Sequence, residues 1–237
     1  ADLALPRRID PEALNCYLAM GYVPGERCML QGFNKLPPAH ALLFDLRTGQ
    51  TRIWRYWQLP DLEAASSRPI DEAALLNELE ALLEDAVRRQ MVADVPLGAF
   101  LSGGIDSSLI VALMQAASTR PVKTFTIGFD VPDYDEAPHA RAVARHLGTE
   151  HTELYVRPED ALSVIPRLPA MYDEPFADCS QIPTFLVSAL ARQQVTVSLS
   201  GDAGDELFAG YNTYSMAERF ERIAASMPEF FRQFLAG

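Results

Sequence analysis

The chain has 237 residues, 49% of them hydrophobic, and a formal net charge of −12 at pH 7. This length accommodates one full α/β domain and a small appendage. The sequence has neither an apolar run long enough to span a membrane nor a start typical of a signal peptide, so we expect a cytoplasmic protein without membrane association. A broadly acidic surface repels phosphate backbones, which argues against nucleic acid as a partner.

The first 60 residues have a different sequence pattern from the rest of the chain. Asp10 predicts the start of a short amphipathic helix over residues 13–20, and Gly21 predicts its end. Residues 41–46 and 51–59 are rich in β-formers and predict a β-hairpin. This segment is too small for a core of its own, so we interpret residues 1–60 as the C-terminal remnant of a domain.

Residues 61–70 read as a linker, and Asp71 predicts the N-cap of a long helix that runs to about Met91. One stripe of this helix is apolar at helical spacing. The stripe consists of Leu75, Leu76, Leu79, Leu82, Leu83 and Val87.

From residue 95 onward, strand-like and helix-like segments alternate. Continuous apolar runs predict buried strands at residues 95–101, 122–129, 151–156 and 195–199. Amphipathic patterns predict helices at residues 106–117, 135–147, 159–168 and 182–193. This alternation is typical of the α/β class, here a doubly wound, mainly parallel sheet preceded by the hairpin. Ligands of such sheets bind beyond the carboxyl ends of the strands.

Residues 101–108, LSGGIDSS, form a glycine-centred segment at such a strand end, called here the first loop. Gly103 and Gly104 let the backbone approach an anion closely, and the following helix points its free amides at the same place. Asp106 would repel a bare phosphate but suits Mg2+ bridging phosphate oxygens. The loop lacks the Gly-Lys-Ser/Thr of ordinary P-loops. It resembles the pyrophosphatase loop, Ser-Gly-Gly-x-Asp-Ser, of enzymes that split ATP into AMP and pyrophosphate.

Residues 198–211, SLSGDAGDELFAGY, follow another apolar run and are called here the second loop. Its carboxylates, Asp202, Asp205 and Glu206, lie within five positions and repel one another unless a cation is present. Helix capping is the alternative explanation for Asp202 and Asp205. Because both loops begin at strand ends, we expect them to converge on one crevice.

The second loop resembles a signature of glutamine-dependent asparagine synthetases. Residues 172–178 (YDEPFAD) resemble a stretch upstream of it in one branch of that family, and residues 126–129 (TIGF) resemble the family's second core strand. Residues 35–38 (KLPP) resemble the end of its glutaminase domain. On this basis residues 1–60 are a glutaminase-type remnant, and residues 71–237 are an ATP-binding synthetase domain that is incomplete at its C-terminus.

The resemblance implies a ligase. A carboxylate of aspartate attacks ATP, pyrophosphate leaves, and ammonia from glutamine displaces AMP to give asparagine. The implied cofactors are ATP and Mg2+, and the implied partners are aspartate with ammonia or glutamine, with a homodimer of the full-length protein left open. Asp106 and Asp205 are implied to hold the metal, and Asp202 is implied to accept a proton from the incoming amine. The residues implied to bind the nucleotide are Phe100, Ser102, Gly103, Gly104, Asp106, Ser107, Ile127, Ser200 and Gly201.

The chain departs from the family pattern. Ala39, Ala203 and Ala209 stand where the family has glycine, and alanine resists positive φ. The chain opens without the family's N-terminal cysteine and ends before the family's essential downstream lysine. We therefore expect a fragment that binds ATP but turns over poorly or not at all.

Other interpretations stay open. A same-fold amidotransferase or a β-lactam synthetase-like cyclase would act on another carboxylic acid, and a silent nucleotide-binding protein would not catalyse at all. A tRNA-modifying enzyme is disfavoured by the acidic charge. His139, His146 and His151 are interpreted as surface or strand-edge residues. The three cysteines lack a CxxC pattern, so we expect neither a disulfide framework nor a zinc site, and we expect Cys179 to be a buried or semi-buried thiol.

Overall fold

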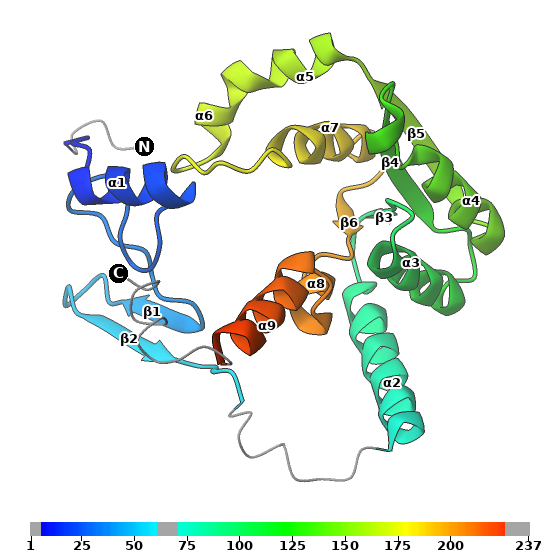
Figure 1. Ribbon diagram of the computed structural model, residues 1–237, viewed down its shortest axis with the longest axis horizontal. Coiled ribbons are helices and arrows are strands. Elements are labelled where there is room, and N and C mark those ends of the chain that lie inside the picture. Colours follow the sequence, from blue (N-terminus) through cyan, green and yellow to red (C-terminus); the bar gives the residue numbers. More distant parts are fainter. Residues whose placement is uncertain (1–5, 61–70, 226–237) are drawn as a thin grey trace. The chain divides into compact units, whose positions relative to one another are not determined.

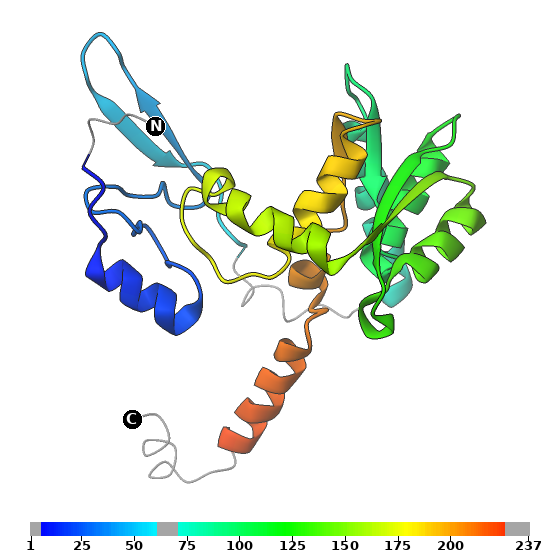
Figure 2. The ribbon, with the colours of Figure 1, turned by 90° about the horizontal axis from the view of Figure 1, so that it is seen from above.

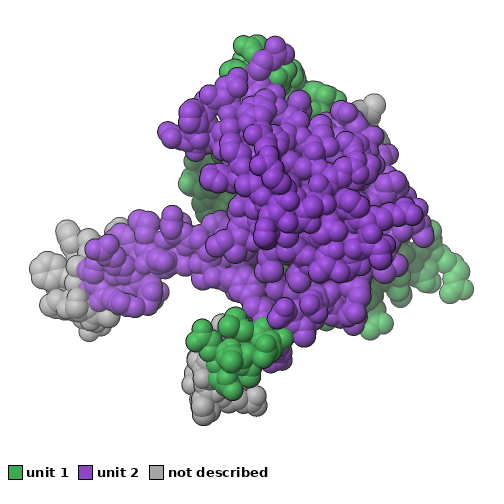
Figure 3. Space-filling model, turned by 90° about the vertical axis from the view of Figure 1, so that its right-hand side faces the viewer, with its two compact units in different colours: residues 1–77, 158–185 green, residues 78–157, 186–237 purple. Residues whose placement is uncertain are grey.

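The computed structural model describes residues 6–60 and 71–225. The chain divides into two compact units, one of Ala1–Asn77 with Pro158–Phe185 and one of Glu78–Arg157 with Leu186–Gly237 (Figure 3). The predicted linker at residues 61–70 lies outside the described residues. The predicted division into a remnant at 1–60 and a synthetase domain at 71–237 stays a prediction.

The first unit begins with helix α1, Pro11–Met20 (Figure 1). The Asp10 carboxylate accepts hydrogen bonds from the amides of Glu12 and Ala13, at 2.9 and 3.3 Å. Gly21 ends the helix in the left-handed region at φ 82°. Both predicted helix ends are confirmed, because Asp10 satisfies first-turn amides and glycine adopts positive φ without strain.

A hairpin follows, with strand β1 at His40–Phe44 and strand β2 at Thr51–Arg55. The strands pair antiparallel, with Leu42 opposite Ile53. The Asp45 carboxylate accepts from the amides of Arg47 and Thr48, which stabilises the connecting turn. The predicted hairpin is confirmed with shorter strands.

The rest of the first unit shows one wrong prediction. In place of a single helix at 159–168, the chain forms α5 (Pro158–Val164), the 3-10 turn η3 (Ile165–Arg167) and α6 (Leu168–Met171). Pro166 has no amide hydrogen to donate within a continuous helix, which explains the interruption. Helix α7, Gln181–Ala191, then leads into the second unit.

The second unit holds the predicted parallel sheet. Its strands are β3 (Leu97–Phe100), β4 (Lys123–Phe129), β5 (Glu150–Val156) and β6 (Val197–Leu199). They lie in the order β5-β4-β3-β6, and every pairing is parallel. Five consecutive residues of β4 are buried, as expected for a strand covered on both faces.

Helices cover both faces of this sheet (Figures 1 and 2). On one face, α3 (Ile105–Ala117) and α4 (Ala137–Leu147) pack with the end of α2 (Glu72–Gln90) around Ala99, Val111 and Met114. On the other face, Leu190 and Ala191 of α7 pack on Phe125. The remaining elements are η2 (Pro132–Tyr134), α8 (Gly204–Phe208) and α9 (Asn212–Ala225).

The predicted helix α2 forms, and the Asp71 carboxylate accepts from the Ala74 amide at 3.1 Å, as its N-cap. The apolar stripe of α2 is only partly buried. Val87 is 4% exposed, but Leu75, Leu76 and Leu82 are more than half exposed. Helical periodicity predicts which residues share a face, but whether another element covers that face depends on tertiary packing.

Candidate active site

The first and second loops emerge from neighbouring strands. The first loop follows β3 and the second follows β6, and these strands pair directly. From β3 the chain proceeds to β4 and β5 on one side, whereas β6 lies on the other side. The gap between β3 and β6 is therefore the switch point at which open α/β sheets bind ligands.

A cleft of about 640 Å³ lies between these loops. Sites for small molecules commonly have volumes of roughly 300–1,000 Å³. The predicted site residues that line it are Phe100, Ser102, Gly104, Asp106, Ser107, Ser200, Gly201, Asp202 and Asp205. Of the other two, Ile127 is buried in β4, and Gly103 faces α4. The cleft is also lined by two exposed apolar residues that were not predicted, Ile105 and Phe208. Ile105 could have been noticed in the sequence, because it is an apolar residue in the first turn of the helix that follows the first loop.

Hydrogen bonds within the first loop hold its shape. The hydroxyls of Ser102 and Ser107 lie 2.8 Å apart, and the Ser102 amide donates to the Ser107 Oγ at 3.2 Å. The Gly104 amide donates to the Ser102 Oγ. Gly104 is the N-cap of α3 and has no side chain to cap it, so the first-turn amides of α3 can donate to an anion.

Glycines of the second loop bring it into direct contact with the first. A Cβ on Gly201 would lie 2.6 Å from the Ser107 nitrogen, and a Cβ on Gly204 would lie 2.5 Å from the Asp106 Cγ. Only glycine permits this approach. The Asp106 carboxylate therefore lies on the first turn of α8, where the next residue, Asp205, also lines the cleft.

This arrangement suits one kind of metal site. Among residues 6–60 and 71–225, no three His, Cys, Asp or Glu side chains gather closely enough to hold an ion by themselves. Mg2+ is usually bound by one or two carboxylates together with substrate phosphates. Asp106 and Asp205 therefore fit an ion that arrives with a polyphosphate and do not form an all-protein cage.

The carboxylates of the second loop have different partners. Asp202 accepts a hydrogen bond from the Ser200 hydroxyl at 2.8 Å, and Glu206 accepts one from the Tyr211 hydroxyl at 2.8 Å. The bond to Glu206 raises the pKa of Tyr211 to about 12. Glu206 is thus engaged with Tyr211, whereas Asp205 and Asp106 both line the cleft.

The three alanines at family-glycine positions all adopt positive φ. The φ angles are 58° at Ala39, 73° at Ala203 and 56° at Ala209. Within the described residues these are the non-glycine positions in this region of φ. Because a Cβ is strained there, the backbone keeps a conformation suited to glycine at all three sites.

Residues outside the cleft agree with most expectations. His139 and His146 are exposed on α4, and His151 lies on the edge strand β5, as predicted. The three cysteines are free, but Cys179 is exposed, so the predicted buried or semi-buried thiol is wrong. It lies in the turn before α7, where the Asp178 carboxylate accepts from the Ser180 amide. In the same part, every helix is too short or too polar to cross a membrane.

Fold and cleft together define a parallel α/β protein in which two glycine-rich loops meet at the switch point of the sheet. Residues 78–236 match the family model described as asparagine synthase. The chain belongs to the asparagine synthase family.

Two curated relatives show how much of the family protein is present. A putative glutamine-hydrolysing asparagine synthetase 2 of Methanocaldococcus jannaschii is 40% identical over 94% of this chain and 42% of its own length. The glutamine-hydrolysing asparagine synthetase 1 of Bacillus subtilis is 35% identical over 92% of this chain and 34% of its own length. The chain thus spans less than half the length of these relatives.

Among solved structures, an NH3-dependent NAD synthetase from Campylobacter jejuni aligns with a TM-score of 0.40 and 15% identity. The alignment covers 57% of this chain and 60% of that one.

Proposed function

We propose that this chain carries the ATP-cleaving site of a ligase that converts the side-chain carboxylate of aspartate into an amide. The contact between the two loops carries the proposal. It gathers free helix amides, serine hydroxyls and two carboxylates in one cleft at the switch point. These groups are suited to an Mg2+-bound polyphosphate.

The proposed reaction has two steps. An oxygen of the substrate carboxylate bonds to the α-phosphorus of ATP, the bond to the β-phosphate oxygen breaks, and pyrophosphate leaves. Ammonia then bonds to the acyl carbon, the bond to the AMP oxygen breaks, and the amine gives up a proton. Bound Mg2+ would neutralise the phosphate charge that develops in the first step.

The protein's residues have distinct roles in this proposal. Ser102, Ser107 and the first-turn amides of α3 hold the phosphates, and Asp106 and Asp205 bind the metal. Asp202 accepts the proton in the second step, with its carboxylate oriented by the Ser200 hydroxyl. Phe100, Ser200 and Gly201 line the nucleotide, as proposed also for Gly103, Gly104 and Ile127.

The choice of the acid and of the ammonia source rests on the names of the relatives, which specify asparagine synthesis and glutamine hydrolysis. We propose aspartate as the acid and glutamine as the source of ammonia in the longer protein, with a cytoplasmic location. A homodimer of that protein is part of the same proposal.

The experiment measures aspartate-dependent exchange of pyrophosphate into ATP in the presence of Mg2+, with the longer protein. Exchange isolates the first step, because it needs neither ammonia nor glutamine. Exchange with aspartate but not with other carboxylic acids supports the proposal. Exchange with another acid identifies a same-fold enzyme of different specificity. Binding of Mg2+-ATP without exchange for any acid indicates a silent nucleotide binder, which the strained Ala203 favours.

A further inference from the structure

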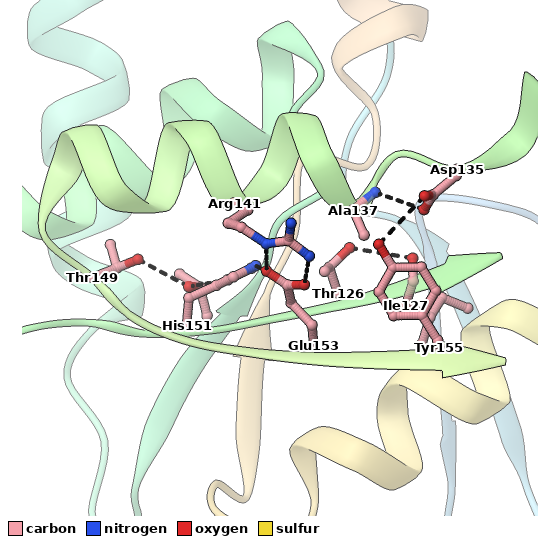
Figure 4. A network of polar contacts seen from close by, with 10 residues as sticks. Thr126, Ile127, Asp135, Ala137, Arg141, Thr149, His151, Glu153 and Tyr155 are labelled. Carbon is pink, nitrogen blue, oxygen red and sulfur yellow. Dashed lines mark hydrogen bonds and ion pairs between the residues drawn. The ribbon is translucent and has the colours of Figure 1, made fainter. Parts of the chain in front are cut away.

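Asp135 joins three elements beside the carboxyl end of the sheet (Figure 4). Its Oδ1 accepts from the Phe129 amide at 3.3 Å, at the end of β4, and from the Ala137 amide at 3.2 Å, at the start of α4. Its Oδ2 accepts from the Tyr155 hydroxyl of β5 at 3.4 Å. One carboxylate thus fixes the start of α4 against two strands.

The surroundings of this carboxylate are tightly packed. A Cβ on Gly128 would lie 2.8 Å from the Tyr155 ring and 2.9 Å from the Asp135 Oδ1. Ala137, the first residue of α4, is fully buried. Removal of the Asp135 carboxylate leaves the amides of Phe129 and Ala137 without this acceptor, which loosens the start of α4.

The next turn of α4 supports the first loop. Gly103 has a φ of 85°, and a Cβ there would lie 2.6 Å from the Ala140 nitrogen and 2.7 Å from the His139 carbonyl carbon. The first-loop backbone thus rests on helix backbone without an intervening side chain. On another side, Gly201 packs equally closely on Ser107. The first loop is held between α4 and the second loop.

We infer that Asp135 is a positioning residue for the first loop, acting through α4, with Tyr155 orienting its carboxylate. The inference rests on the proposed function, because the loop is there assigned to the phosphates of ATP. Asp135 does not line the cleft. Its effect on nucleotide binding is transmitted through the contact of Gly103 with α4.

The same network offers a matched control. Farther along α4, Arg141 donates to Glu153 of β5 at 2.7 Å, and Figure 4 shows this pair beside His151. Like Asp135, the pair ties α4 to β5. Neither Arg141 nor Glu153 is among the nearest contacts of Gly103. Arg141 also interacts with Tyr155, so the control changes Glu153 instead. Glu153→Met removes the ion pair between helix and strand and keeps the contacts of Asp135 and Tyr155.

The experiment compares Asp135→Ala with Glu153→Met in two measurements. Hydrogen exchange of the ligand-free protein reports on the first loop directly, and calorimetry gives the dissociation constant of Mg2+-ATP. We expect Asp135→Ala to speed amide exchange at residues 101–108 and to weaken Mg2+-ATP binding about tenfold. Glu153→Met should change neither by more than about twofold, despite a similar loss of stability.

Milder variants test the same role if Asp135→Ala does not fold. Asp135→Asn keeps an oxygen for the two amides and should restore Mg2+-ATP affinity to within about twofold. Tyr155→Phe should weaken it about threefold, because only the orienting hydroxyl is lost.

Two results would overturn the inference. One is wild-type exchange and affinity in both Asp135→Ala and Tyr155→Phe. The other is an equal effect of Glu153→Met, which would reduce Asp135 to a general stabiliser of α4. If the wild-type protein fails to bind Mg2+-ATP, the proposed function is wrong, whereas the exchange comparison still decides the role of Asp135.

Discussion

At the scale of single residues, Ala203 is the clearest strained position of the cleft region. Its φ of 73° precedes the first turn of α8, where glycine would be unstrained. We expect Ala203→Gly to raise the free energy of unfolding by about 0.5–1 kcal/mol, because relief of the strained Cβ exceeds the extra entropy of the unfolded chain. Urea denaturation measures the change.

The matched control is Ala86→Gly, the same chemical change at an exposed position inside α2. There glycine should lower the free energy of unfolding by about 1 kcal/mol. If both substitutions destabilise the protein equally, the positive φ of Ala203 is not a source of strain.

Substitution of Asp106 should affect the binding of ATP differently with and without Mg2+. Without Mg2+, its charge repels phosphate, so Asp106→Ala should leave ATP binding unchanged or slightly tighter. With Mg2+, loss of a metal ligand should weaken binding about tenfold or more, about 1.4 kcal/mol. Titrations with Mg2+ and with a chelator measure both. Glu84→Gln, an exposed change on α2, should alter neither, and equal losses from Asp106→Ala in the two titrations would exclude the metal role.

The position of Asp106 and the convergence of the two loops on one cleft could be predicted from the sequence, but the direct contact of Asp106 with Gly204 could not. Motif spacing places Asp106 at the start of a helix after a buried strand. The contact of its carboxylate with Gly204 depends on β6 pairing with β3, a long-range choice that local patterns do not encode. The predicted burial of Cys179 was wrong for the same reason, because the exposure of a side chain depends on tertiary packing.

At the scale of elements, the first unit joins segments far apart in the chain. Glu174 pairs with Lys35 and accepts from the Met29 amide at 3.1 Å. Lys35 also donates to the Val23 carbonyl at 2.6 Å. The Ala177 amide donates to the Gly21 carbonyl at 2.6 Å. Residues 21–35 therefore pack on residues 174–177 through a compact polar contact.

This contact predicts a measurable coupling between Lys35 and Glu174. Their side chains are 33% and 25% exposed, so solvent screens the pair only partly. We expect a double-mutant cycle of Lys35→Met and Glu174→Gln to give about 1–2 kcal/mol in the free energy of unfolding. The more exposed pair of Arg27 and Glu12 should give a clearly smaller coupling, because solvent screens it more fully. Equal coupling in the two cycles would show that burial of the Lys35 pair adds nothing.

The elements themselves could largely be predicted, because helical and strand periodicity are local. The failures occur where two local signals compete or where packing decides. At residues 159–168 the amphipathic pattern favoured one helix, but Pro166 interrupts it. In α2 the leucine stripe predicted the helix correctly, while Leu75, Leu76 and Leu82 stay exposed among the described residues.

At the scale of the whole molecule, the net charge of −12 and the buried imidazole of His151 have opposite effects on stability as pH falls. Protonating carboxylates and histidines relieves the self-repulsion of an acidic protein. His151, however, has only 9% of its side chain exposed, with its Nδ1 2.8 Å from the Thr124 hydroxyl. Burial lowers the pKa of His151, Glu153 counteracts this, and the charge of Arg141 adds to the lowering.

The sign of the local effect follows from the lowered pKa. Below pH 6.5, the unfolded chain binds a proton at position 151 that the folded protein resists, so stability is lost as pH falls from 6.5 toward the folded pKa. The slope of this loss of stability with pH is at most about 1.4 kcal/mol per pH unit. Glu153 has a lowered pKa, chiefly through its hydrogen bond with Arg141, and its contribution is lost in a separate window, below pH 4.5.

We therefore expect His151→Gln to flatten the decline of stability between pH 6.5 and 5, measured by urea denaturation at several pH values. His146→Gln, at an exposed position on α4, should leave the decline as in the wild type. Salt separates the two contributions, since about 0.5 M screens surface repulsion but hardly affects a desolvated imidazole. Because screening removes the opposing relief of repulsion, the decline should be at least as steep in salt. A decline that disappears in salt, or that persists in His151→Gln, would exclude the burial of His151 as its cause.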